Sequence, residues 1–288
     1  MSKHKNITEN LMRAIFTFCA FASIAFVIII TAFLLLSGMP AIKKIGAGAF
    51  LFGKVWRPTG QSPLYGILPF IASSVLGTLC AVLLGVPIGI LCAIYISKFA
   101  PRRICPVLTS AVELLSGIPS VVYGLTGMII IVPAVRKAFS LPDGANLFSA
   151  IIVLAVMILP SVISVSVTAL SAVPKEYEEG SLALGATKCE TVFKVTVPAA
   201  KSGILASVVL GMGRAVGEAM AVMMVSGNTP NMPALFKSVR FLTTAVASEM
   251  SYSSGLQREA LFSIALVLFA FILVINLVLN LVVKKRKR

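Results

Sequence analysis

Residues 14–36 read AIFTFCAFASIAFVIIITAFLLL, a run of 23 positions without a charged side chain. A helix needs about 20 apolar residues to cross the hydrocarbon core of a membrane, so this run predicts a membrane span. A cleaved signal peptide is disfavoured, because its apolar region is normally about 7 to 15 residues long and the nearest small-x-small triplet lies far downstream, at 47–49. We therefore expect the chain to keep this segment as its first membrane helix.

The rest of the chain repeats this pattern. Five more segments carry few or no charges, namely 67–96, 107–133, 147–171, 202–226 and 260–283. The composition agrees, because 58% of the residues are hydrophobic and 12% are charged, whereas a soluble domain has about 45 to 50% and about 25%. We therefore expect an all-α, polytopic membrane protein with about six transmembrane helices.

The distribution of charge predicts the orientation of these spans. An even number of spans puts both termini on one side of the membrane, and the basic residues at the end of the chain assign that side to the cytoplasm. The resulting plan has an N-terminal span with an outer loop (1–66), a transmembrane domain (67–283) that contains a cytoplasmic loop (172–202), and a basic cytoplasmic tail (284–288).

The residue inventory excludes several functions. The net charge of +15 suits nucleic acid or a membrane surface, and the apolar composition selects the membrane, so no nucleic-acid partner is expected. One His and one Asp cannot supply a His-based triad, a paired-Asp site or a His-rich metal site within the spans. Residues 48–54 match GxxxxGK, but Val55 replaces the Ser or Thr of a phosphate-binding loop. We therefore expect no catalytic residue, no metal site and no cofactor on this chain.

The predicted cytoplasmic loop carries helix signals of its own and is too long for a simple turn. Pro174 suits a first helical turn, and Gly185 suits the left-handed residue that ends a helix. Thr187 and Glu190 form a capping box that starts a second helix, and Pro198 marks where that helix breaks or kinks. The pattern predicts a helix-turn-helix that is either a solvated connector or a docking element for a cytoplasmic partner.

The predicted span 202–226 contains two charges, Arg214 and Glu218. In a continuous helix they lie four residues apart on one face, and the small residues Ser207 and Gly211 share that stripe. Such a stripe permits close helix packing or lines a solute path. The two charges either form a buried pair that fixes the helix register or lie at a translocation path. The translocation path is favoured, because charges inside a membrane are usually tied to transport.

The cytoplasmic loop also resembles a known motif. Its spacing is that of the E-A-A-x3-G-x9-I-x-L-P loop of ABC-importer permeases, on the residues Glu179, Gly180, Ser181, Gly185, Val195 and Pro198. Gly180 and Ser181 stand in place of the two alanines, and Val195 in place of the isoleucine. The resemblance implies that these six residues belong to coupling helices, which dock on a separate ATPase.

A second resemblance narrows the family. Residues 213–228, GRAVGEAMAVMMVSGN, look very like the PstC-type permeases of phosphate ABC importers, as do 65–69 (YGILP) and 117–124 (GIPSVVYG). The resemblance covers nearly the whole chain. It implies a type I ABC-importer permease fold, a multi-pass place in the bacterial cytoplasmic membrane, and inward movement of inorganic phosphate.

The resemblance also implies partners. These are a PstA-like second permease subunit, two ATP-binding subunits that hold the ATP and Mg, and an extracellular phosphate-binding protein, all assembled in membrane lipid. Three alternatives stay open: a sister permease of the PstA type, a permease for another oxyanion, and a proton-coupled secondary transporter in which Glu218 or Glu113 titrates.

Overall fold

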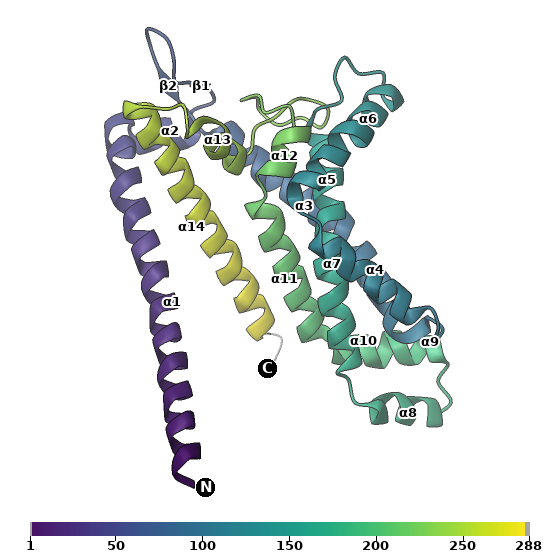
Figure 1. Ribbon diagram of the computed structural model, residues 1–288. Coiled ribbons are helices and arrows are strands. Elements are labelled where there is room, and N and C mark those ends of the chain that lie inside the picture. The colour runs from purple at the N-terminus through teal and green to yellow at the C-terminus, as the bar shows by residue number, and fades with distance from the viewer. Residues whose placement is uncertain (1, 286–288) are drawn as a thin grey trace.

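The computed structural model describes residues 2–285 and is built almost entirely of helices (Figure 1). Five helical segments are long and apolar enough to cross a membrane: Leu11–Ile45, Leu68–Phe99, Ser120–Ala138, Leu147–Ser171 and Gly255–Val278. A sixth is reached if the bent pair Lys188–Ala199 and Lys201–Gly217 counts as one span. The predicted helical membrane fold is therefore confirmed. The departures from an all-α fold among the described residues are a short antiparallel hairpin of β1 (Trp56–Arg57) and β2 (Leu64–Tyr65) and an isolated β-bridge between Gly227 and Val239.

The first span is longer than predicted. Helix α1 (Ser2–Ile45) continues through Pro40 into the region predicted as an outer loop, and α2 (Ala47–Phe52) follows after Gly46. Helix α1 packs on α14 (Gly255–Lys285), where the Ser263 hydroxyl donates a hydrogen bond to the Gly38 carbonyl. A Cβ atom on Gly38 would lie 3.0 Å from the Phe262 carbonyl oxygen, so this glycine lets the two helices approach closely.

Three long helices form the centre of the molecule. Helix α3 (Leu68–Ile94), which continues as the π-helix η1 (Tyr95–Phe99), packs on α7 (Leu147–Ser171), and α7 packs on α11 (Lys201–Gly217). Leu154, Met157 and Ile158 of α7 are completely buried between its neighbours. A Cβ atom on Gly85 of α3 would lie 2.8 Å from the Ala155 carbonyl oxygen, so a missing side chain again permits the contact.

The predicted span 107–133 is broken into two parts. Helix α4 (Cys105–Gly117) ends before Ile118 and Pro119, which are extended, and α5 (Ser120–Thr126), the π-helix η2 (Gly127–Ile131) and α6 (Val132–Ala138) follow. Proline has no N–H to donate and disfavours a helical conformation in the residue before it, which explains the break. Pro87 and Pro160, in contrast, lie inside α3 and α7 without ending them.

The predicted span 202–226 is also broken. Helix α11 ends at Gly217, Glu218 is extended with φ −73° and ψ 128°, and a short helix α12 (Met220–Val225) follows. The next loop contains α13 (Leu242–Glu249), which packs on α14.

The two ends of the molecule carry different elements (Figure 1). The start of α1 and the end of α14 lie toward the same end as α8 (Lys175–Ala183), α9 (Lys188–Thr191), the π-helix η3 (Val192–Thr196) and α10 (Val197–Ala199). The β1–β2 hairpin, α2, α12 and α13 lie at the opposite end. This arrangement agrees with an even number of spans; residues 286–288 of the predicted basic tail lie outside the described residues.

Candidate functional site

Arg214 lies in the last turn of α11 and is half-buried. Its Nη1 atom donates a hydrogen bond to the hydroxyl of Ser161 in α7 at 3.3 Å. Within residues 2–285, no ion pair joins Arg214 to a carboxylate. Since an arginine stays charged in a protein, the guanidinium retains donors with which it could hold an anion.

Glu218 does not lie on the same helix as Arg214, so the predicted pair on one helical face is wrong. Its carboxylate instead accepts a hydrogen bond from the N–H of Ala221 at 2.9 Å, in the first turn of α12. Its backbone carbonyl accepts a hydrogen bond from the hydroxyl of Thr243 in α13 at 2.7 Å. Glu218 therefore holds three helices together at the break, a role that the sequence pattern did not indicate.

Ser207 and Gly211 face α7. The Ser207 hydroxyl lies 2.9 Å from the hydroxyl of Ser166, and a Cβ atom on Gly211 would lie 2.9 Å from Cγ2 of Val162. Both residues are buried, Ser207 completely. For these two residues of the small-residue stripe, the structure therefore shows close helix packing.

A polar cluster that sequence reasoning missed lies at the end of the molecule that carries α13. The Arg240 guanidinium is paired with Glu249 and donates from Nε and Nη2 to the Asn228 carbonyl at 3.0 and 2.9 Å. Glu249 also accepts from Nε1 of Trp56 at 3.2 Å and from Nε2 of Gln257 at 3.1 Å. In the sequence, Arg240 and Glu249 are two of five charged residues between the predicted spans 202–226 and 260–283, which is too weak a signal to identify this cluster.

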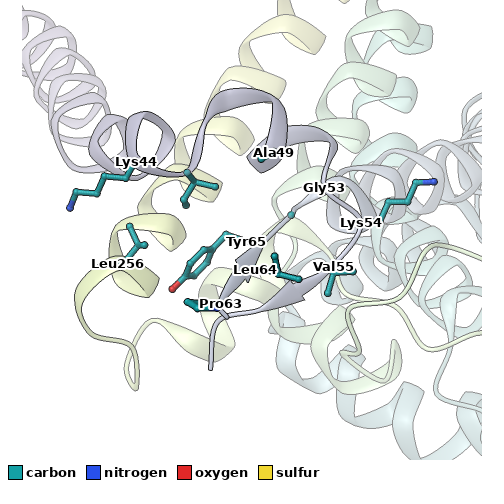
Figure 2. Close-up of a pocket in the computed structure, with 11 residues that line it drawn as sticks. Lys44, Ala49, Gly53, Lys54, Val55, Pro63, Leu64, Tyr65 and Leu256 are labelled. Atoms are coloured by element: carbon teal, nitrogen blue, oxygen red, sulfur yellow. The ribbon is translucent and has the colours of Figure 1, made fainter. Parts of the chain in front are cut away.

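A cavity of 520 Å³ lies at this same end, between α1, α2, the hairpin and the start of α14 (Figure 2). Its lining includes the side chains of Val55, Leu64 and Leu256. The ammonium groups of Lys44 and Lys54 point away from it (Figure 2), and Lys44 is paired with Glu259 at 2.8 Å. The cavity therefore offers no cluster of cations for an anion.

The helix signals that the sequence shows in residues 172–202 are confirmed. Helix α8 begins after Pro174, and Gly185 has the left-handed conformation with φ 89° just beyond its end. The Thr187 hydroxyl accepts from the N–H of Glu190, and the Glu190 carboxylate accepts from the N–H of Thr187, so the predicted capping box is formed. Hydrogen bonds from the Thr187 N–H and then from Lys194 lower the pKa of Glu190 to about 2, so this carboxylate stays ionised at mildly acidic pH as well.

The helix that the capping box starts ends close to Pro198. After α10, which contains Pro198, the chain turns by 70° at Ala200 into α11. The predicted break therefore lies two residues beyond Pro198 rather than at it.

The six predicted coupling residues differ in their exposure to solvent. Glu179, Gly180, Gly185 and Pro198 are exposed, whereas Ser181 and Val195 are half-buried. The Ser181 hydroxyl lies 3.0 Å from Oγ1 of Thr191 and so attaches α8 to α9.

An apolar side chain that the motif does not include stands out on the same segment. Leu184 is 91% exposed, and Tyr177 and Leu182 of the same segment are 56% and 47% exposed. Exposed apolar side chains of this size are available for contact with another protein.

Comparison with known proteins gives the following relatives. The family described as "Binding-protein-dependent transport system inner membrane component" matches residues 85–288. The chain is 41% identical over 283 residues to a probable ABC transporter permease protein, YqgH, of Bacillus subtilis, with 95% of this chain and 92% of the relative covered. It is 32% identical to the phosphate transport system permease protein PstC of Haemophilus influenzae, with 94% and 92% covered.

Two solved structures show the same fold. A bacterial ABC transporter involved in the import of alginate superposes with a TM-score of 0.60 at 14% identity, covering 93% of this chain and 99% of that chain. An inward-facing form of the MetNI methionine ABC transporter superposes with a TM-score of 0.58 at 19% identity, covering 77% and 95%.

Proposed function

We propose that this chain, which belongs to the family of binding-protein-dependent transport system inner membrane components, moves inorganic phosphate inward. As a member it is the permease of an ABC importer, a non-catalytic, multi-pass component of the inner membrane. The choice of phosphate is supported by the PstC relatives, at 30 to 34% identity over most of the chain.

The observation that carries this proposal is the environment of Arg214. A charge inside a membrane is costly, so it is kept for a purpose or compensated by a counter-charge. Here the only hydrogen bond of the guanidinium to another side chain among the described residues is with the neutral hydroxyl of Ser161. A guanidinium can hold a phosphate oxygen pair in a bidentate contact. Arg214, with Glu218 at the adjoining break, is therefore our candidate for the translocation path, and Ser207 and Gly211 support it from the α7 interface.

The proposal extends to the other subunits. A second permease, PstA-like, completes the path, and an extracellular phosphate-binding protein delivers the anion. Two ATP-binding subunits hold the ATP and Mg and dock on α8 and the residue that follows it, where Glu179 and Leu184 are exposed. In this arrangement the end that carries α8 and both described chain ends faces the cytoplasm.

Uptake of radiolabelled phosphate by the reconstituted complex tests the proposal. Arg214→Gln should abolish uptake while the complex still assembles, and Arg214→Lys should retain part of it, because lysine keeps the charge without the bidentate geometry. Arg258→Gln, at an exposed position, is the matched control and should transport normally. Normal uptake by Arg214→Gln would contradict the proposal and show that Arg214 serves only in helix packing.

The same assay distinguishes the other candidates. Labelled sulfate that accumulates in place of phosphate would identify a permease for another oxyanion. Uptake that needs no ATPase and collapses with an uncoupler would identify a proton-coupled secondary transporter.

A further inference from the structure

Helix α8 is attached to the rest of the chain almost without apolar packing. None of its residues is buried. Along residues 175–183 only Glu178 and Ser181 are half-buried, and the other positions are exposed. Any force applied to α8 must therefore reach the membrane-spanning helices through polar contacts or through the short chain segments at its two ends.

Glu178 makes polar contacts that connect α8 to η1 and η3. Its Oε1 atom lies 2.5 Å from Nζ of Lys98, and the hydroxyl of Thr196 donates to the same oxygen at 3.2 Å. The side chains of Lys98 and Glu178 are only 13% and 27% exposed. Solvent screens a pair this enclosed less than a surface pair, so the contact is strong and directional.

The two partners of Glu178 belong to the packed centre of the molecule. Lys98 lies in η1, the continuation of α3, and Thr196 lies in η3, which leads through α10 into α11. Apolar residues of α3, η1, η3 and α11 form one buried cluster beside them, including Ile94, Ile96, Val192 and Ile204. A displacement of Glu178 is therefore passed to two membrane helices at once.

We propose that Glu178 and Lys98 form a strut that transmits movement of α8 to α3. This inference rests on the proposed function, in which a separate ATPase moves α8. Glu178 directly precedes Glu179, the first residue of the family motif. Glu179 is exposed and available to the docking partner, whereas Glu178 contacts Lys98. Glu178 and Lys98 are positioning residues, because neither is placed at the solute path.

Spin-label distances in the assembled complex test the strut. One label is placed at Leu83 of α3 and one at Leu277 of α14, which are 71% and 61% exposed, in a chain whose five natural cysteines are replaced by alanine. The distance is measured without nucleotide and with a non-hydrolysable ATP analogue. The unmodified pair should show a nucleotide-dependent shift, and Glu178→Gln and Lys98→Met should each lose it while the ATPase still co-purifies.

A charge exchange separates transmission from simple damage. Lys98→Glu combined with Glu178→Lys should restore the shift, since the pair is re-formed with its charges reversed. Glu190→Gln is the matched control, because the Glu190–Lys194 pair lies on the same segment but is far more exposed, at 47% and 75%. This control should leave the shift unchanged.

Four results would overturn the strut: a shift that persists in the single variants, a charge exchange that restores nothing, a control that loses the shift equally, or no shift in the unmodified complex. The readout does not depend on which anion is carried. A complex that shows the shift but takes up no phosphate would refute the phosphate assignment and leave the strut standing.

Discussion

The guanidinium of Arg240 is paired with the carboxylate of Glu249 from the far end of helix α13, and the two side chains are 13% and 20% exposed. Trp56 from the hairpin and Gln257 from α14 bind the same carboxylate, and the Asn228 carbonyl binds the guanidinium. Four separate segments of the chain thus meet at one ion pair. This cluster fixes the end of the molecule at which the hairpin lies.

Removing one partner of this pair should destabilise the protein strongly. Glu249→Gln leaves an enclosed guanidinium without its counter-charge, at an expected cost of about 2 to 3 kcal/mol in the free energy of unfolding. Thermal unfolding in detergent measures the change. Lys44→Gln breaks the more exposed Lys44–Glu259 pair and should cost less than about 1 kcal/mol; equal losses in the two variants would contradict the structural importance of the cluster.

Two glycines in and just after helix α8 should respond to alanine in opposite ways. An added Cβ atom meets nothing within 4 Å at either Gly180 or Gly185, but Gly185 has φ +89°. Gly180→Ala should stabilise α8 by about 0.5 to 1 kcal/mol, because glycine is a poor helix former. Gly185→Ala should destabilise the end of α8 by about 1 to 2 kcal/mol, because the left-handed conformation is strained for alanine.

Hydrogen–deuterium exchange over residues 175–187 measures both effects. Exchange should slow by roughly two- to fivefold in Gly180→Ala, the factor that corresponds to its expected stabilisation. It should quicken in Gly185→Ala. The same direction of change in both variants would show that backbone conformation does not decide the outcome.

Two roles of the Glu218 side chain, as a hydrogen-bond acceptor for α12 and as a negative charge, can be tested separately. Glu218→Gln keeps a side-chain oxygen that can accept from the Ala221 N–H, so the thermal midpoint should stay unchanged. Glu218→Ala loses the cap and should cost about 1 kcal/mol. If the carboxylate also serves release of an anion from Arg214, Glu218→Gln should lower phosphate uptake despite its normal stability. Normal uptake in Glu218→Gln would assign the residue to capping alone.

The contact between α11 and α7 should tolerate no added methyl group where the helices touch. A Cβ atom on Gly203 would lie 2.4 Å from the Cβ of Ala169, and Gly203→Ala should therefore cost about 1 to 3 kcal/mol. Gly213 lies in the same helix with nothing within 4 Å, so Gly213→Ala should be neutral or slightly stabilising. Thermal unfolding of the two variants side by side checks the prediction, and an unharmed Gly203→Ala would refute the close packing.

The features that could be predicted from the sequence are those set by local signals. Pro174, Gly185 and the Thr187–Glu190 capping box each act within one turn of helix, so the helices of residues 172–202 were predicted almost completely. The apolar spans were predicted because the membrane itself imposes their length and composition.

The predictions from sequence fail where contacts with residues distant in the chain determine the backbone conformation. The predicted Arg214–Glu218 pair assumed a continuous helix, yet Glu218 is held at a break by Thr243, which lies 25 residues further along the chain. The contact between Lys98 and Glu178 joins residues 80 positions apart, and no periodic pattern connects them. Pro119 lies inside the predicted span 107–133, but the sequence alone does not tell whether a proline kinks a helix or ends it.

The absence of buried side chains in α8 has a consequence for how such a chain evolves. Substitutions on its outward face do not disturb the packing of the spans, so in the proposed assembly this face is free to adapt to a new motor subunit while the conduit stays intact. Grafting the helix from a related chain should then exchange the motor that is recruited, as long as a carboxylate remains opposite Lys98.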